Sequence, residues 1–252
     1  MRNAMENGTV YIYDGNFQGF LTAAGEALDS GLPVQDICRA TQGQSALFAQ
    51  MRHVLSHRQK AELLWRKLEK KSPSLPRLVY FSFLSERSGI ELFIYKYLSL
   101  LFNAIEADAP ELSVWRQRLE SVARRVELEK RELECDLPFR ATRDGILCAW
   151  VNPLHNTLPL LTRHCKNRFA GQSWMIYDAR RSYGIYCHGG TLELVGCRAD
   201  ALGPFTAAPD RERVGNPEIF EIHTLRSLLL PKVVQQPQAA VHREPQRMRS
   251  AV

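Results

Sequence analysis

Residues 146–195 read ILCAWVNPLHNTLPLLTRHCKNRFAGQSWMIYDARRSYGIYCHGGTLELV, and this stretch decides the fold class. The apolar run at 146–151 predicts a strand, whereas 156–169 has the apolar spacing of a helix. Asn156 suits the N-cap of that helix, and Pro159 would lie in its first turn, where a missing N–H costs little. The stretch therefore begins as a strand followed by a helix.

Three short strands are predicted after this helix. They cover 174–177, 183–187 and 192–195, and the tight turns between them contain Arg-Arg-Ser and His-Gly-Gly. Because short turns join antiparallel neighbours, these strands are expected to form an antiparallel meander. We therefore predict a small antiparallel sheet within 139–198, covered by the 156–169 helix.

The chain before residue 139 is predicted to be mainly helical. Apart from a short strand at 11–13, apolar residues recur at three- and four-residue steps through 17–135, including most of 45–71. The predicted fold class is α+β, with this helical region packed on the antiparallel sheet. An alternative is two separable domains joined near 136–139.

The C-terminal part of the chain gives a weaker signal. We assign 10–198 to one α+β domain and treat 199–230 as an extension without a clear element pattern. Residues 231–252 are rich in Pro, Gln, Arg and Ala and lack apolar periodicity, so a disordered basic tail is expected.

The charge of the chain favours an anionic partner. The 252 residues carry a formal net charge of +6, and the sequence pI is about 9.1. Over 139–198 there are eight Lys and Arg residues against three Asp and Glu. Nucleic acid is the first candidate partner and a membrane surface the second, with a solvated basic face as the plain alternative.

Features of several other protein classes are missing from the sequence. Residues 1–10 lack the apolar core of a signal peptide, and the apolar run at 90–105 is interrupted by charges and too short to span a bilayer. The six cysteines contain no C-x-x-C pair, which argues against a zinc knuckle or an iron–sulfur cluster. We expect a cytoplasmic protein that needs no metal or other cofactor and contacts no membrane.

The candidate nucleic-acid contacts lie within residues 146–195. Cationic side chains could bind phosphates there, and flat aromatic side chains could stack on bases. The candidate residues are Arg163, Lys166, Arg168, Arg180 and Arg181 for phosphate, with Trp150 and Tyr183 for stacking. The alternative is that the cations are solvated and that the aromatic residues, Trp174 among them, belong to the core.

The same stretch also permits acid–base chemistry. His155, His164 and Asp178 could transfer protons if they converged on one pocket. Asp178 could instead pair with an arginine, and each histidine could be an ordinary surface or core residue. The sequence has no G-x-S-x-G elbow, phosphate-binding Walker loop, H-E-x-x-H motif or dinucleotide glycine fingerprint.

Three blocks of the sequence resemble a bacterial family, domain of unknown function 4130. They are YIYDGNFQGFL at 11–21, LVYFSFLSERSGIE at 78–91, and the motifs P-x-H, L-P-L-L-x-x-H, R-F, W-x-I-Y-D and R-x-Y-G-I-Y within 150–186. The resemblance implies a DNA-metabolism protein, in repair or modification, that is linked to a radical S-adenosylmethionine partner. Similar domains occur fused to uracil-DNA-glycosylase-like domains.

The sequence departs from the family pattern at two places. Glu134 stands where the family tends to have a histidine, and no tryptophan follows Trp174. The sequence thus leaves three hypotheses: a DNA-binding protein that works with a radical S-adenosylmethionine protein, an enzyme that acts on a nucleic-acid base or backbone, and a protein–protein adaptor without nucleic-acid contact.

Overall fold

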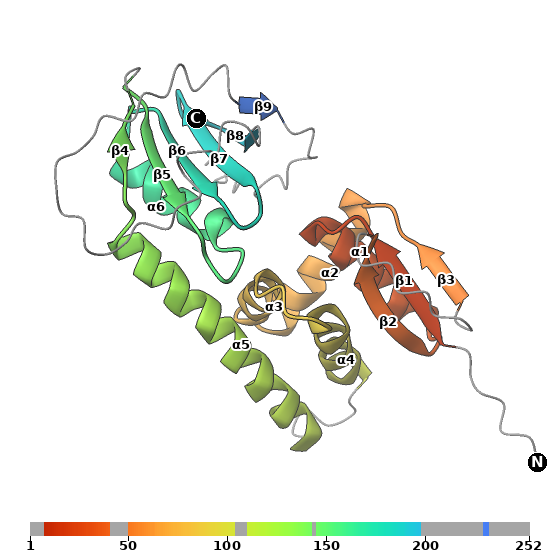
Figure 1. Cartoon of the computed structure of the whole chain (residues 1–252). Helices are drawn as coiled ribbons and strands as arrows, with labels where there is room; N and C mark the ends of the chain where they lie inside the picture. The colour runs from red at the N-terminus through yellow and green to blue at the C-terminus, as the bar shows by residue number, and fades with distance from the viewer. Residues whose placement is uncertain (1–7, 41–49, 104–109, 143–144, 198–228, 232–252) are drawn as a thin grey trace, which may run out of the picture.

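The computed structural model describes residues 8–40, 50–103, 110–142, 145–197 and 229–231. Helices and strands are mixed along the chain, which confirms the α+β class. As Figure 1 shows, a small N-terminal sheet and a larger C-terminal sheet lie on either side of a group of helices.

The N-terminal sheet is parallel. Strand β1 (Thr9–Tyr13) lies between β2 (Val34–Arg39) and β3 (Gln50–His53) and runs parallel to both. Helix α1 (Phe17–Ser30) connects β1 to β2, and its first turn is capped by Asn16, whose side-chain oxygen accepts a hydrogen bond from the Gly19 N–H at 2.7 Å.

Strands β2 and β3 correct the prediction that 17–135 is helical. The prediction for 45–71 was also wrong at its start, because β3 precedes α2 (Arg58–Lys71). All four residues of β3 are exposed, so the strand lacks the apolar alternation that identifies a half-buried strand. Pairing with β1, rather than its own side chains, defines this strand.

The remaining helices of this half follow the predicted pattern. They are α3 (Leu75–Leu84), α4 (Ile90–Asn103) and the long α5 (Pro110–Cys135). Aromatic rings join α3 to α1: Phe20 of α1 stacks on Phe83 of α3 with ring centroids 5.3 Å apart. The group shares one apolar core with β1 and α1.

The second sheet has the strand order β4-β5-β6-β7-β8-β9. Its strands are β4 (Arg140–Ala141), β5 (Leu147–Val151), β6 (Trp174–Asp178), β7 (Tyr183–His188), β8 (Thr191–Cys197) and β9 (Leu229–Pro231). The predicted meander is confirmed for β6, β7 and β8, which are antiparallel neighbours.

One pairing in this sheet differs from the prediction. Strands β5 and β6 are parallel, because helix α6 (Leu158–Arg168) crosses over between them and returns the chain to the same end of the sheet. The sheet is therefore mixed rather than wholly antiparallel. The N-cap of α6 is Thr157, not Asn156, whereas Pro159 lies in the first turn as predicted.

Helix α6 covers one face of the second sheet. Leu158, Leu161 and Cys165 of the helix pack on Trp174 and Ile176 of β6, and all five are fully buried. The prediction that Trp174 belongs to the core is confirmed. Burial among apolar groups raises the pKa of the Cys165 thiol to about 12.

Two predictions concern residues that the structure leaves mostly undescribed. The extension at 199–230 is described only at Leu229 and Leu230, and the tail only at Pro231, which ends β9. The expected disorder of 232–252 lies outside the described residues. Within the described ranges, no helix combines the length and apolar character that a membrane-spanning helix needs.

Candidate functional site

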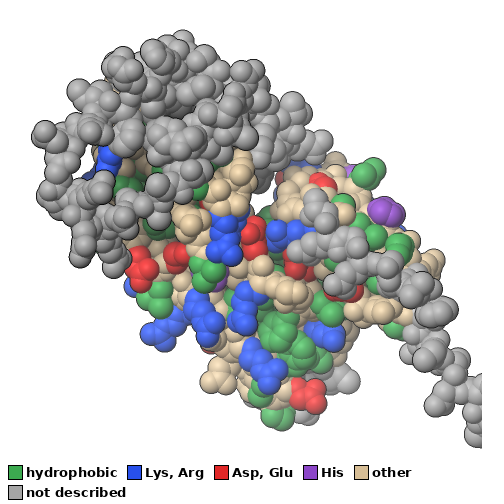
Figure 2. All heavy atoms as spheres, viewed as in Figure 1, with side chains coloured by type: hydrophobic (Ala, Val, Ile, Leu, Met, Phe, Trp, Pro, Cys, Tyr) green, Lys and Arg blue, Asp and Glu red, His purple; other side chains and the backbone are tan. Residues whose placement is uncertain are grey.

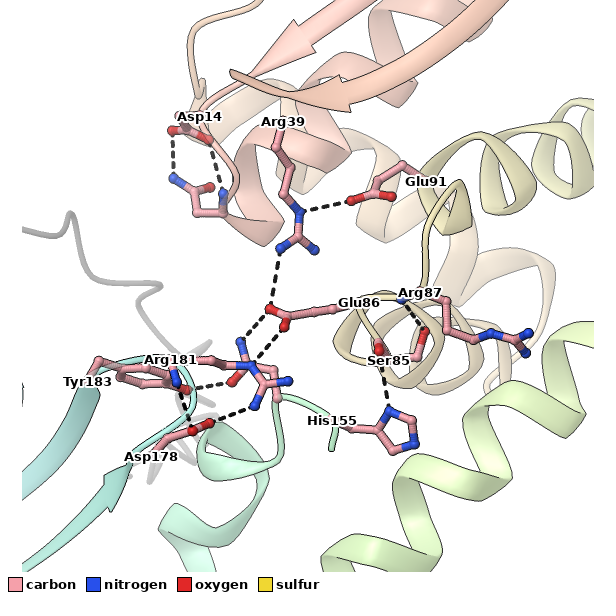
Figure 3. Close-up of polar contacts among 12 residues, drawn as sticks. Asp14, Arg39, Ser85, Glu86, Arg87, Glu91, His155, Asp178, Arg181 and Tyr183 are labelled. Atoms are coloured by element: carbon pink, nitrogen blue, oxygen red, sulfur yellow. Dashed lines mark hydrogen bonds and ion pairs between the residues drawn. The ribbon is translucent and has the colours of Figure 1, made fainter. Parts of the chain in front are cut away.

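Glu86 lies at the centre of a polar cluster between the two sheets. It follows α3 in the loop before α4 and has a positive φ of 51°, which is unusual for a residue with a side chain. Its carboxylate accepts hydrogen bonds from Arg181 Nε at 2.7 Å, Asn156 Nδ2 at 3.2 Å and Arg39 Nη1 at 3.3 Å. Figure 3 shows the Arg39 and Arg181 side chains pointing toward Glu86 from opposite sides. One carboxylate thus links the loop to both sheets.

Arg181 is held on several sides at once. Besides its bond to Glu86, Nη1 donates to Asp178 Oδ2 at 2.7 Å and to the Pro153 carbonyl, and Nη2 donates to the Leu154 carbonyl at 2.9 Å. The Arg181 backbone N–H also donates to Asp178. Asp178 is fully buried, so its charge is balanced inside the protein by this guanidinium.

The N-terminal side of the cluster is equally connected. Arg39, at the end of β2, donates from Nε to Glu91 at 3.0 Å, and its guanidinium lies over the Phe83 ring. The Tyr13 hydroxyl at the end of β1 donates to the same Glu91 oxygen at 2.9 Å. Burial, followed by the charge of Glu91, raises the pKa of Tyr13 far above its ordinary value.

Tyr183 and Asn156 complete the arrangement on the side of the second sheet. The Tyr183 hydroxyl donates to Asn156 Oδ1 at 2.5 Å, and Asn156 in turn donates to Glu86. Burial, followed by the charge of Asp178, raises the pKa of Tyr183, so the hydroxyl keeps its proton. We refer to the whole set as the polar junction. It consists of Tyr13, Arg39, Glu86, Glu91, Asn156, Asp178, Arg181 and Tyr183.

The polar junction brings together residues from all three resembling blocks. Tyr13 comes from 11–21, Glu86 and Glu91 come from 78–91, and Arg181 comes from 150–186. The blocks are distant in sequence, since Glu86 and Arg181 are 95 residues apart. In the folded chain the three blocks therefore meet at this set of charge-assisted hydrogen bonds.

The structure does not bring the three candidate acid–base residues together. His155 is buried, with Nδ1 3.3 Å from the Ser85 carbonyl, and Figure 3 shows it turned toward Ser85 while Asp178 faces Arg181. His164 lies on α6, and its buried Nε2 has no hydrogen-bond partner in the described part of the chain. No hydrogen bond of the described residues joins any two of the three. Acid–base chemistry by this trio stays a prediction.

The candidate nucleic-acid contacts fall into two groups. Four of the cations have exposed side chains, namely Arg163, Lys166, Arg168 and Arg180. The other three candidates are engaged internally: Arg181 and Tyr183 in the polar junction, and Trp150 against Tyr177, with ring centroids 6.1 Å apart. The exposed cations are therefore the candidates best placed to reach a phosphate.

A comparison with protein-family models identifies the family. A model described as a domain of unknown function, DUF4130, matches residues 88–249, well over half of the chain. The chain belongs to this family. No curated protein matches the sequence. The DUF4130 match includes Glu91, Asn156, Asp178 and Arg181 but leaves Glu86 and Arg39 outside, so the polar junction extends beyond it.

Sequence reasoning missed Glu86, Arg39 and Asn156 as site residues. Glu86 stands in the quoted block LSERSGIE, so its place in a resembling motif was the available signal. Its positive φ and its partners in both sheets are properties of the folded chain. Within the described residues, no group of three or more His, Cys, Asp and Glu side chains could hold a metal ion.

The polar junction predicts how acid affects stability. Burial opposes the ionisation of Glu86, but Arg181 and Arg39 outweigh it and lower its pKa below the usual 4.5. Because the folded pKa is the lower one, the stabilisation is present above the unfolded pKa and is lost as pH falls through the folded pKa. We expect Glu86→Gln to have a lower free energy of unfolding than wild type, by an amount that does not change with pH near neutrality. Below about pH 4 this difference should become smaller.

Urea unfolding followed by circular dichroism across this pH range would measure that difference. Glu120→Gln is the matched control, because Glu120 pairs with Arg116 on the exposed side of α5. A difference that widens on acidification would show that Glu86 does not act as an ionised partner.

Proposed function

We propose that this protein acts in DNA metabolism, in repair or modification, by binding nucleic acid through α6 and the turn between β6 and β7. The observation that carries the proposal is that four cations on these elements are exposed and unpaired among the described residues. Arg163, Lys166, Arg168 and Arg180 are exposed, and none forms an ion pair with a described residue. Such side chains can exchange counterions for phosphates.

Three cations of α5 differ from these, because each has a carboxylate partner on the same helix. Arg116 pairs with Glu120, Lys130 with Glu134, and Arg131 with Glu127, in each case four residues apart on the helix. An internal carboxylate already neutralises each of these charges. Helix α6 has no Asp or Glu between Leu158 and Arg168, so its charge is of one sign. A field of one sign attracts a polyanion more strongly than a mixed surface does.

The topology spreads these cations along the sheet. Because β5 and β6 are parallel, α6 begins near the carboxyl end of β6, where Arg180 follows, and ends near the amino end of β6. The α6 cations lie between Arg163 and Arg168, which are about 8 Å apart along the helix axis, the length of two or three phosphates along one DNA strand. The spacing supports contact with a backbone rather than with a single phosphate.

Salt-dependent DNA binding tests this proposal. The triple variant Arg163→Ala, Lys166→Ala, Arg168→Ala removes the three α6 cations from the full-length protein. We expect about a tenfold loss of affinity at low salt, and a slope of log affinity against log salt that is shallower by about 3 than in wild type. Fluorescence anisotropy with a labelled duplex and a labelled single strand would measure both quantities.

A matched triple variant provides the control. Lys96→Ala, Arg118→Ala, Arg125→Ala removes the same charge from exposed positions on α4 and α5. We expect a smaller loss that reflects net charge alone. Equal losses in the two triple variants would refute the assignment to α6, and binding without salt dependence would refute phosphate contact altogether.

The proposal includes action beside a radical S-adenosylmethionine enzyme in the cytoplasm. The resemblance to the family supports the partner, and the predicted DNA target supports the location. Affinity purification of the full-length protein from a bacterial host tests the partner. The expected result is a co-purifying protein with the absorbance of an iron–sulfur cluster and the ability to cleave S-adenosylmethionine. Recovery of DNA without such a protein would support the nucleic-acid function and contradict the proposed partner.

A further inference from the structure

An open groove runs between α3 and α5, and it shares no lining residue with the polar junction or with α6. It has a volume of about 640 Å³ and is lined by residues from Ser74 to Phe81 on α3 and from Arg116 to Arg131 on α5. The lined part of α5 is about 22 Å long, or four helical turns. None of its lining residues takes part in the proposed DNA contacts.

The groove has an apolar floor. Leu78 and Phe81 of α3 and Ala123 and Leu128 of α5 line it. Leu128 is 48% exposed, which is high for a leucine on a helix that packs against its neighbours. An apolar strip between two helices is the feature that grooves for amphipathic helices share.

The rims of the groove carry more positive than negative charge. Four arginines line it, and two glutamates are placed among them. Glu127 is shared between Arg77 at 2.7 Å and Arg131 at 2.6 Å, and Glu120 pairs with Arg116. Arg124 has no carboxylate partner in the described part of the chain. Figure 2 shows Lys and Arg side chains over the α3 and α5 region, with hydrophobic side chains between them.

We propose that this groove binds an acidic amphipathic helix of a protein partner. The apolar face of such a helix would cover Leu128 and the floor, and its carboxylates would pair with Arg124 and with the arginines that share glutamates. The length of the groove fits about four turns of the partner helix, which places apolar side chains at the spacing i, i+3, i+4 and i+7.

The lining favours this occupant over nucleic acid and over a second copy of the chain. A nucleic-acid backbone gains nothing from the apolar floor, whereas the apolar face of a helix is buried there. A second copy carries a net charge of +6 and would bring excess positive charge to a positive rim. An acidic partner matches both the charge and the apolar surface.

A designed peptide tests the site on the full-length protein. The probe is a fluorescein-labelled helical peptide of about four turns, with leucines on one face and glutamates flanking them, and a scrambled peptide of equal composition is its reference. We expect the ordered peptide to bind at least tenfold more tightly than the scrambled one. We also expect Arg124→Glu and Leu128→Asp each to weaken binding about tenfold.

The control variant is Arg125→Glu, which reverses an exposed charge on α5 outside the groove. It should bind the ordered peptide as wild type does. Equal binding of both peptides, or equal loss in Arg125→Glu and Arg124→Glu, would overturn the proposal by showing attraction to net charge only.

Competition with DNA separates this site from the proposed DNA contacts. We expect an unlabelled duplex to leave the peptide bound, and Arg124→Glu to bind DNA no more weakly than Arg125→Glu. Displacement of the peptide by DNA, together with selective loss of DNA affinity in Arg124→Glu, would reassign the groove to nucleic acid. If the α6 triple variant bound DNA as wild type does, the proposed DNA contacts would be wrong, but the peptide result would still support the groove.

Discussion

Replacing Glu86 by alanine is expected to lower the free energy of unfolding by about 3 kcal/mol. The substitution leaves Arg181 and Arg39 without a shared anion, although their side chains are only 13% and 17% exposed. Removing one partner of a poorly solvated ion pair costs much more than removing an exposed one, because the remaining charge stays desolvated. Urea unfolding of the full-length protein would measure the difference.

Two further variants make this result interpretable. Glu120→Ala removes a carboxylate that is 52% exposed and is expected to cost about 0.5 kcal/mol or less. Glu86→Gln keeps an oxygen acceptor and should fall between wild type and alanine. If Glu86→Ala cost no more than Glu120→Ala, the polar junction would contribute nothing to holding the two sheets together.

Replacing Trp174 by alanine is expected to cost about 4 kcal/mol. Trp174 is fully buried in β6, where it packs between the second sheet and α6. The substitution opens a cavity that the surrounding β-sheet cannot close, so lost packing adds to the lost transfer free energy. Trp174→Phe fills most of the cavity and should cost about half as much.

Thermal and urea unfolding would measure both tryptophan variants. The matched control is Leu63→Ala, since Leu63 is 60% exposed and its truncation should change stability by about 0.5 kcal/mol or less. A cost below about 1 kcal/mol for Trp174→Ala would mean that the packing of α6 on β6 is loose.

The sequence predicted α6 and strands β5 to β8 of the second sheet well because their signals are local, whereas the short strands β4 and β9 were not predicted. Apolar runs, turn residues and the spacing of α6 lie within a few residues of one another, and three of the strands were placed almost to the residue. The parallel pairing of β5 with β6 was missed, since strand direction depends on how a crossover helix returns to the sheet. The exposed strand β3 gave no local signal at all.

Arg181 illustrates why the candidate site was only partly predictable. An arginine in a turn between two strands suits phosphate contact by residue type alone. Its partner Glu86 lies 95 residues earlier in a loop with an unusual φ, and no spacing rule relates the two. Arg180 is its neighbour in the same turn and yet is exposed, so adjacent identical residues differ in role.

The separation of Glu86 and Arg181 also determines when the polar junction can form during synthesis. Chains emerge from the ribosome at roughly 5 to 20 residues per second, so Arg181 follows Glu86 by roughly 5 to 20 s. Until Asn156 has been made, Arg39 is the one partner of the Glu86 carboxylate among the described residues, and Asn156 can join it before Arg181 does. The first parallel sheet and its helices therefore emerge as a nascent unit, which closes onto the second sheet only after Arg181 has been made.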